Sequence, residues 1–292
     1  FKPYLFHTDD YGKSWENMTT QDQVWTYTLS FVQDPVEPKL MFLGTDGGMY
    51  FSINKGKSWQ KWTNDYPNTP TRDMIIHPRE HDLVIGTFGR AIHVMDDIRP
   101  LRALAREGED MLNKPLAIFE TPTAYQVVNQ QPSGSRFGAN ATFNGENRSD
   151  NAMISYLINT PEMEEEEEKE DEEEEVDKIK YDSLQLHVFT LDGELIRTLK
   201  EKTPKENGVH RMYWRMDEAG SRGPSRTLTK EDAAEPGGVD VLPGDYKLVM
   251  TFGEHKDSTE ITVEFDPRFD VSKEVLKARY DFLKSIESMQ SV

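Results

Sequence analysis

Short apolar runs and period-two alternation, each bounded by turn residues, indicate β-structure along most of the chain. In the first hundred residues the pattern predicts strands at 25–32, 39–44, 49–53, 58–63, 72–77, 82–87 and 91–95. After a loop rich in Gly, Ser and Asn it predicts strands at 152–159, 183–190, 195–199, 208–216, 244–252 and 258–265. A helical or irregular connector is expected over 100–106, and a final helix begins after Ser272, which can cap it.

The N-terminal strands belong to an internal repeat. Residues 6–15 align with residues 50–59 at an offset of 44, and residues 43–50 resemble residues 85–92 at an offset of 42. The first pair shares the pattern Ser/Thr-x-Asp/Asn-x-Gly-x-Ser-Trp, carried by Thr8, Asp10, Gly12, Ser14, Trp15, Ser52, Asn54, Gly56, Ser58 and Trp59. A period of this length is typical of a four-stranded β-propeller blade. The motif then lies in the turn between the third and fourth strands, where it is interpreted as a structural lock, with a ligand or metal site as the alternative.

This motif resembles the Asp box of BNR-repeat proteins, which include sialidases, sortilin-type receptors and xyloglucanase-like hydrolases. Residues 1–100 look most similar to the sortilin-like BNR-repeat proteins of environmental bacteria. The third copy, residues 92–100, lacks Gly-x-Ser-Trp and is interpreted as the last blade, with its outer strand supplied from elsewhere. Two to three blades cannot close a ring, and the chain starts inside a patterned segment. Further blades of the same protein are therefore expected before Phe1, as partners of this piece.

The second half predicts a β-sandwich. Residues 184–189 alternate with period two, and residues 191–194 and 242–245 carry turn signals. Residues 144–147 with 154–157, 191–199, 208–214 and 242–248 resemble the Ig-like module of flagellar hook-capping proteins, which follows propellers in many bacterial BNR-repeat proteins. The expected organisation is propeller blades at 1–98, a linker at 99–139, an Ig-like sandwich at 140–267 and a C-terminal helix at 268–292. The fold class is all-β.

The final helix and one tryptophan each have two interpretations. Leu276, Tyr280, Leu283 and Ile286 form an apolar stripe that packs on its own domain or docks to a partner. Trp214 lies on a predicted strand, where it is a core or rim aromatic, or a stacking platform for a sugar.

Charge is concentrated in one segment. The net charge is −19, and residues 162–175 hold twelve acids and one lysine. This run is interpreted as a solvated insertion in the sandwich, with weak calcium binding as the alternative. Lys and Arg are not clustered, which argues against a nucleic-acid partner. No apolar run is long enough to span a membrane. The chain has no cysteine, which excludes disulfides, thiolate metal sites and a cysteine nucleophile.

No catalytic constellation stands out. The seven histidines show no His-Glu-x-x-His spacing, and Gly-x-Ser-x-Gly is absent. No catalytic residue, metal site or cofactor is therefore assigned. In a propeller the site lies at the central channel, which makes Arg90, Asp46 and Asp73 the ligand-binding candidates, with Asp96 or Asp97 behind them.

Two functions follow from this reading. The preferred one is an extracytoplasmic binding or assembly protein of the bacterial envelope or cell surface, with a glycan or protein ligand. The alternative is a glycoside hydrolase whose catalytic carboxylates lie in blades outside this chain. Because propellers host many functions, fold alone does not choose between them.

Overall fold

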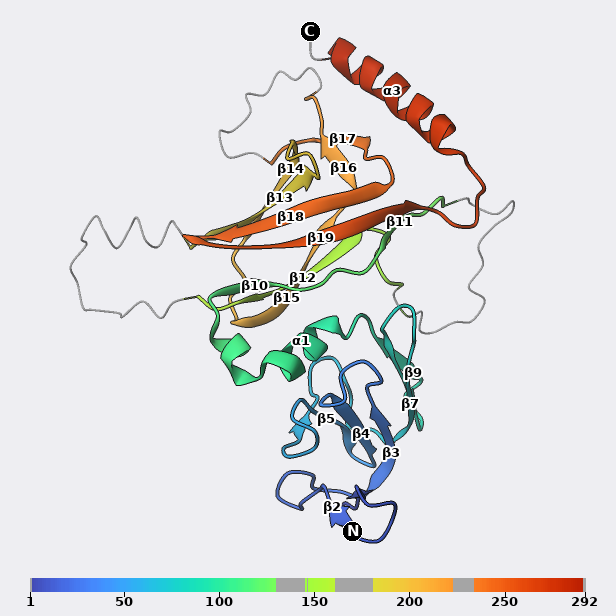
Figure 1. The fold of residues 1–292 in the computed structure, drawn as a ribbon, viewed down its shortest axis with the longest axis vertical. Helices are drawn as coiled ribbons and strands as arrows, with labels where there is room; N and C mark the ends of the chain where they lie inside the picture. Colours follow the sequence, from blue (N-terminus) through green and yellow to red (C-terminus); the bar gives the residue numbers. More distant parts are fainter. Residues whose placement is uncertain (1, 130–144, 146, 161–180, 223–233, 291–292) are drawn as a thin grey trace, which may run out of the picture. The chain divides into compact units, whose positions relative to one another are not determined.

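The computed structural model describes residues 2–129, 145, 147–160, 181–222 and 234–290. Residues 1–113 and 114–292 form two compact units, and each is described by itself. Both are mainly β-structure, so the all-β prediction is confirmed (Figure 1). The acidic run over 162–175 lies outside the described residues.

The first unit is a series of small antiparallel sheets, the geometry expected of successive propeller blades. Two of them are incomplete: a pair of two-residue strands and a sheet of three strands. Between them lies a complete four-stranded sheet in the order β3-β4-β5-β6. The strands are β1 (Phe6–His7) and β2 (Glu16–Asn17); β3 (Thr28–Gln33), β4 (Met41–Thr45), β5 (Gly48–Ser52) and β6 (Gln60–Lys61); and β7 (Thr71–Ile76), β8 (Leu83–Thr87) and β9 (Ile92–Met95).

The sequence pattern located strands β3 to β9 to within a few residues. Within the described residues the β7-β8-β9 sheet has three strands and no outer fourth strand. This matches the interpretation of residues 72–95 as a blade without its own Asp-box turn.

The complete blade is buried on both faces. All five residues of β4 are buried, because alternate side chains enter two different cores. Phe42 joins the core shared with β7 and β8, whereas Leu43 joins the core that includes Val24 and Trp59. The complete blade is therefore the middle layer of the three sheets.

The last blade is covered on one face alone. Ile76 and Leu83 are buried in the core shared with the complete blade. On the other face, Ile75 pairs across the strands with Val84, and Val84 with Val94. Ile75 is 65% exposed and Val94 53%. This row, together with exposed Ile92, forms an apolar sheet face that is open in the described chain.

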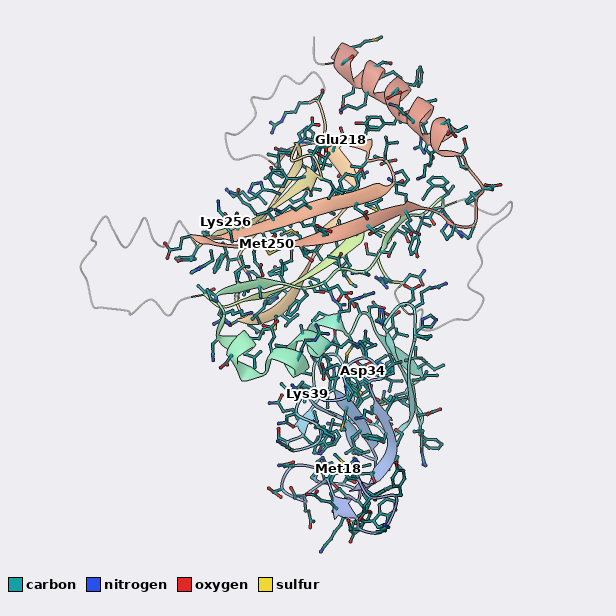
Figure 2. The ribbon with its side chains drawn as sticks, in the orientation of Figure 1. Met18, Asp34, Lys39, Glu218, Met250 and Lys256 are labelled. Atoms are coloured by element: carbon teal, nitrogen blue, oxygen red, sulfur yellow. The ribbon has the colours of Figure 1, made fainter. Side chains whose placement is uncertain are left out.

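The first unit ends in α1 (Arg99–Glu107) and the 3-10 helix η1 (Glu109–Asn113). Arg102 of α1 is 5% exposed and makes a bidentate pair with Asp34 in the loop between β3 and β4. Lys39 of the same loop donates to the Arg106 carbonyl oxygen, and both Asp34 and Lys39 lie beside α1 (Figure 2). These bonds fix α1 to the loops that join the first and second strands of the blades.

The second unit is a β-sandwich. One sheet has the order β10-β12-β15 and the other β11-β19-β18-β13-β14, with β11 parallel to β19 and every other pairing antiparallel. The strands are β10 (Leu116–Ile118), β11 (Ala124–Gln126), β12 (Ala152–Ile158), β13 (Ser183–Thr190), β14 (Leu195–Lys202), β15 (Gly208–Trp214), β18 (Gly244–Phe252) and β19 (His255–Phe265). A single core lies between the sheets and includes Met250 (Figure 2).

Alternation explains this core. In β13, Leu184, Leu186 and Val188 are buried while the intervening side chains are partly exposed, as the period-two pattern predicts. The predicted turn at 191–194 joins β13 to β14, and Gly193 adopts a φ of +89° there. The turn chemistry and the alternation together fix the register of this hairpin.

Two elements complete the unit. A small ribbon of β16 (Asp217–Ala219) and β17 (Gly237–Asp240) lies at one end of the sandwich, and α3 (Lys273–Gln290) contacts β17. The range predicted as a linker, 99–139, contains α1, η1, β10 and β11, and the last two pair with sandwich strands.

Candidate ligand-binding face

The first Asp-box turn is held by hydrogen bonds within itself. The Asp10 carboxylate accepts from the backbone amides of Ser14 at 2.8 Å and Lys13 at 2.9 Å. The Thr8 hydroxyl accepts from the Gly12 amide at 2.8 Å. Hydrogen bonds from Ser14 lower the pKa of Asp10 to about 2, and the bond from its amide has a larger effect than the bond from its hydroxyl.

The second turn repeats this geometry with an amide in place of the acid. Asn54 Oδ1 accepts from the Ser58 amide at 2.9 Å, and Asn54 Nδ2 donates to the Ser58 hydroxyl at 2.7 Å. The Ser52 hydroxyl accepts from the Gly56 amide at 2.9 Å. Gly56 has a φ of +76°, and a β-carbon there would lie 2.4 Å from Cε of Met18. In both turns the polar side chains of the motif make hydrogen bonds within the turn itself.

A different set of loops forms the candidate site. The loop between the second and third strands and the segment leading into the first strand share one end of each blade, because antiparallel strands reverse direction. The Asp boxes and the contacts of α1 lie at the other end. We call the side chains gathered at the first end the loop face: Trp25, Tyr27, Asp46, Lys61, Asn68, Arg72 and Phe88.

One half of the loop face is built around Trp25. Its indole is 62% exposed, and Lys61 Nζ lies 5.8 Å from its ring centroid. Lys61 also donates to Asn68 Oδ1 at 2.6 Å. The indole lies directly over Gly47, where a β-carbon would come within 2.7 Å of the ring. The absence of a side chain at Gly47 therefore positions Trp25.

The other half links the complete blade to the last one. Asp46 accepts a hydrogen bond from the Tyr27 hydroxyl, which raises the pKa of that tyrosine. The Arg72 guanidinium lies 5.4 Å from the ring centroid of Phe88, which is 68% exposed. The Phe88 amide donates to the Pro70 carbonyl oxygen at 2.9 Å, which fixes the loop that carries this ring.

The three ligand-binding candidates of the first unit have different positions. Asp46 belongs to the loop face through Tyr27. Arg90 is exposed in the neighbouring loop between β8 and β9, and its side chain makes no hydrogen bond or ion pair with any described residue. Asp73 is exposed on β7, and its carboxylate accepts from the adjacent Met74 amide at 2.9 Å. Asp97, the reserve candidate, is buried and paired with Arg99 at 2.6 Å.

Trp214 is a core residue, which corrects the sugar-stacking interpretation. Its side chain is fully buried in the sandwich, and Nε1 donates to the Asp217 carbonyl oxygen at 2.9 Å. Its ring lies 5.7 Å from that of Tyr246 in an edge-on arrangement. A buried indole has no free face to offer to a ligand.

Sequence reasoning missed most of the loop face. Trp25, Lys61, Arg72 and Phe88 carry no motif, and they come from four separate segments. The repeat could have indicated them, because Phe88 stands where the complete blade has Asp46, at the turn between the second and third strands. The sequence does not show which side chains of two neighbouring blades face one another.

The loop face has binding chemistry. It combines two exposed aromatic rings, each with a cation near its face, with one carboxylate and one carboxamide. Among the described residues, no group of three or more His, Asp or Glu side chains is arranged to hold a metal ion. Within the same residues, no helix has the length and apolar character needed to cross a bilayer.

Comparisons with known proteins bear on the first unit. Residues 4–101 match the Sortilin-Vps10 family, described as sortilin, neurotensin receptor 3. No curated protein matches the chain. One similar solved structure is the extracellular domain of a protein described as a one-component system of B. thetaiotaomicron, at 11% identity and a TM-score of 0.27. The alignment covers 90% of this chain and 29% of that one, and a score this low transfers neither fold nor function. The family likeness therefore concerns the blades and leaves the sandwich unassigned.

Proposed function

We propose that this chain belongs to an extracytoplasmic bacterial binding protein, and that its β-propeller takes an acidic glycan on the loop face. The observation that carries the proposal is the pair of exposed rings, Trp25 and Phe88, each with a cation within 6 Å of its centroid. The matching family is that of sortilin, a neurotensin receptor, which suits a binding role outside the cytoplasm.

The propeller is inferred to continue beyond the described blades. Trp15 holds the same repeat position as Trp59, yet 61% of it is exposed against 5%. The open face of β7-β8-β9 carries Ile75, Ile92 and Val94, which no described residue covers fully. A blade before β1 would bury Trp15 as the β1-β2 segment buries Trp59, and a neighbouring blade would cover the open face. These blades are the proposed partners of this piece within one protein.

The sandwich is inferred to be of the Ig type. Taking the eight main strands in chain order, the first, third and sixth form one sheet, and the second, eighth, seventh, fourth and fifth form the other. Ig-like sandwiches split their strands between two sheets in a comparable way. In this sandwich the last two strands, β18 and β19, pair with each other, and β18 also pairs with β13. The parallel pairing of β11 with β19 then corresponds to a first strand that crosses between the sheets.

The chemistry of the loop face favours a sugar with carboxylate groups. Exposed rings offer apolar faces for the C–H surface of a sugar ring, while Lys61 and Arg72 attract its anionic groups. Asp46 and Asn68 supply acceptors and an amide for hydroxyls. A neutral glycan or an apolar peptide has no anionic group to pair with Lys61 and Arg72, so an acidic glycan fits the loop face better.

Binding of oligogalacturonate to the 292-residue chain tests the proposal, with a neutral cello-oligosaccharide for comparison. We expect Trp25→Ala to weaken binding by about tenfold, which corresponds to about 1.4 kcal/mol of lost contact with the ring. Trp15→Ala is the matched control, because Trp15 is equally exposed, at 61% against 62%, but lies in an Asp-box turn. An equal loss of glycan affinity in both variants would show that the loop face is not the binding site.

The glycoside hydrolase alternative would place its catalytic carboxylates outside residues 1–292. It predicts hydrolysis of the bound oligosaccharide by a longer protein, whereas the binding proposal predicts an unaltered ligand. Product analysis of a bound oligosaccharide separates the two. Binding of an acidic peptide in place of the glycan would instead support a protein ligand.

A further inference from the structure

A second candidate site lies in the other unit, between α3 and the edge of the sandwich. A cavity of about 370 Å³ opens there. This volume is at the small end of the range for organic ligands, about 300–1,000 Å³. Nothing in the proposed function uses this cavity, so the inference stands apart from the loop face.

Apolar side chains from three segments that are distant in sequence form part of the cavity wall, beside a larger polar part. Val128 follows β11, Leu242 follows β17, and Leu276 and Leu283 come from α3. The two leucines of α3 are half-buried rather than fully packed, so the helix covers the sandwich edge without filling the space. The predicted stripe on α3 therefore faces its own domain, as the first interpretation held, except that Ile286 is 39% exposed.

Polar contacts from the middle of α3 join the helix to the β16–β17 ribbon. Tyr280 donates to Glu218 Oε1 at 2.6 Å, and Lys284 pairs with Glu218 Oε2 at 3.0 Å. Glu218 projects from β16 toward the helix (Figure 2). These contacts hold the cavity open at a defined width, because they bond the helix to the ribbon beside it.

The cavity wall carries charged side chains of both signs. Two guanidinium groups, Arg215 and Arg279, line the cavity with two carboxylates, Asp150 and Asp240. Asp150 already accepts from Asn129 at 2.7 Å, and Asp240 from Arg279 at 3.4 Å. Arg215 is exposed and makes no hydrogen bond or ion pair with any described residue. Each guanidinium has five donors, and the described residues take few of them. The charge of Arg215 also acts on the buried Asp217 carboxyl, where it opposes the rise in pKa that burial causes.

We propose that this cavity binds a small carboxylic acid with an apolar body, such as a short fatty acid or an aromatic acid. Its carboxylate pairs with Arg215, and with the remaining donors of Arg279, in the bidentate geometry that a guanidinium favours. Its hydrocarbon part lies against Leu276, Leu283 and Leu242. An amine is disfavoured beside Arg215, because two cations repel each other.

Calorimetric titration of the 292-residue chain with hexanoate, and with hexanol as its neutral counterpart, tests the proposal. We expect hexanoate to bind at least about tenfold more tightly than hexanol, as a charge-assisted pair implies. Arg215→Gln removes that preference, while Arg211→Gln, an exposed arginine on β15 outside the cavity, keeps it. Leu283→Ala weakens both probes, and Phe282→Ala, on the solvent side of α3, weakens neither.

Three results would overturn the site. One is equal binding of acid and alcohol by the unaltered chain. Another is undiminished hexanoate binding by Arg215→Gln with an unchanged melting curve. The third is the absence of binding by either probe. Failure here leaves the glycan test untouched, because that test reads variants of the first unit.

Discussion

Trp15 and Trp59 occupy the same position in two copies of one repeat, but their surroundings differ. The Trp59 indole is 5% exposed and donates to the Met18 carbonyl oxygen at 2.9 Å. The Trp15 indole is 61% exposed and donates to Gly12 of its own turn at 3.2 Å. The residue that covers Trp59 belongs to the preceding copy, so the burial of this tryptophan depends on the blade before it.

This relationship predicts unequal costs of truncation. In the 292-residue chain, Trp59→Ala should destabilise the first unit by about 3–5 kcal/mol, because it opens a cavity between two sheets. Trp15→Ala should cost less than about 1 kcal/mol, since its ring is mostly in water. Urea unfolding of both variants measures the difference. In a longer protein with a blade before β1, the cost of Trp15→Ala should approach that of Trp59→Ala, and an unchanged cost would contradict the proposed preceding blade.

The Asp10 turn predicts an acid-sensitive contribution to stability. Its folded pKa of about 2 lies below the ordinary value near 3.9, so the folded state binds the proton less readily than the unfolded state. The contribution is fully present above about pH 4 and is lost as the pH falls toward 2. Asp10→Asn should remove this dependence while keeping the turn, since Asn54 makes the equivalent bonds in the second copy.

Unfolding free energy measured against pH for the original chain and Asp10→Asn checks this. The two curves should converge between pH 4 and 2, because the variant has no charge to lose there. Asp9→Asn is the control, because the contact found for Asp9 is the ion pair with His7 and not a bond within the turn. Parallel curves for Asp10→Asn would rule out the predicted contribution.

The Asp34–Arg102 pair predicts a large effect of removing one partner. Both side chains are almost fully buried, with the bidentate bonds at 2.5 and 2.9 Å. Asp34→Ala should cost about 3–5 kcal/mol, because it leaves the guanidinium buried without its counter-charge. The double variant Asp34→Leu with Arg102→Met should recover most of that loss. Thermal unfolding of the single and double variants tests this, and equal instability of the two would show that the pair also has a role beyond charge balance.

Gly47 provides a test of the loop face that leaves the fold in place. A methyl group at Gly47 would lie 2.7 Å from the Trp25 ring, so Gly47→Ala should turn the indole away from Lys61. We expect weaker glycan binding with little change in melting temperature. Gly86→Ala is the control, since its added β-carbon would make ordinary contacts of 3.7 Å or more. Binding that is unaffected by Gly47→Ala would mean that the orientation of Trp25 does not matter.

Sequence patterns determined most of the secondary structure. The strands at 183–190 and 244–252 were predicted with the bounds found, because period-two alternation and flanking turns are local signals. The repeat likewise located the blades, since each copy must form the same turn. β16 and β17 were missed, because they are short and owe their pairing to residues far apart in sequence.

The site itself needed the tertiary structure. Arg90 and Asp46 could be named from their place in the repeat, but the contacts among Trp25, Lys61, Arg72 and Phe88 arise between loops of two blades. Trp214 was named as a ligand-binding candidate but is buried in the sandwich core. A tryptophan on a strand looks the same in sequence whether its ring is buried or exposed. Local signals are encoded in neighbouring residues, whereas burial and convergence are properties of how sheets pack, and the sequence alone does not display them.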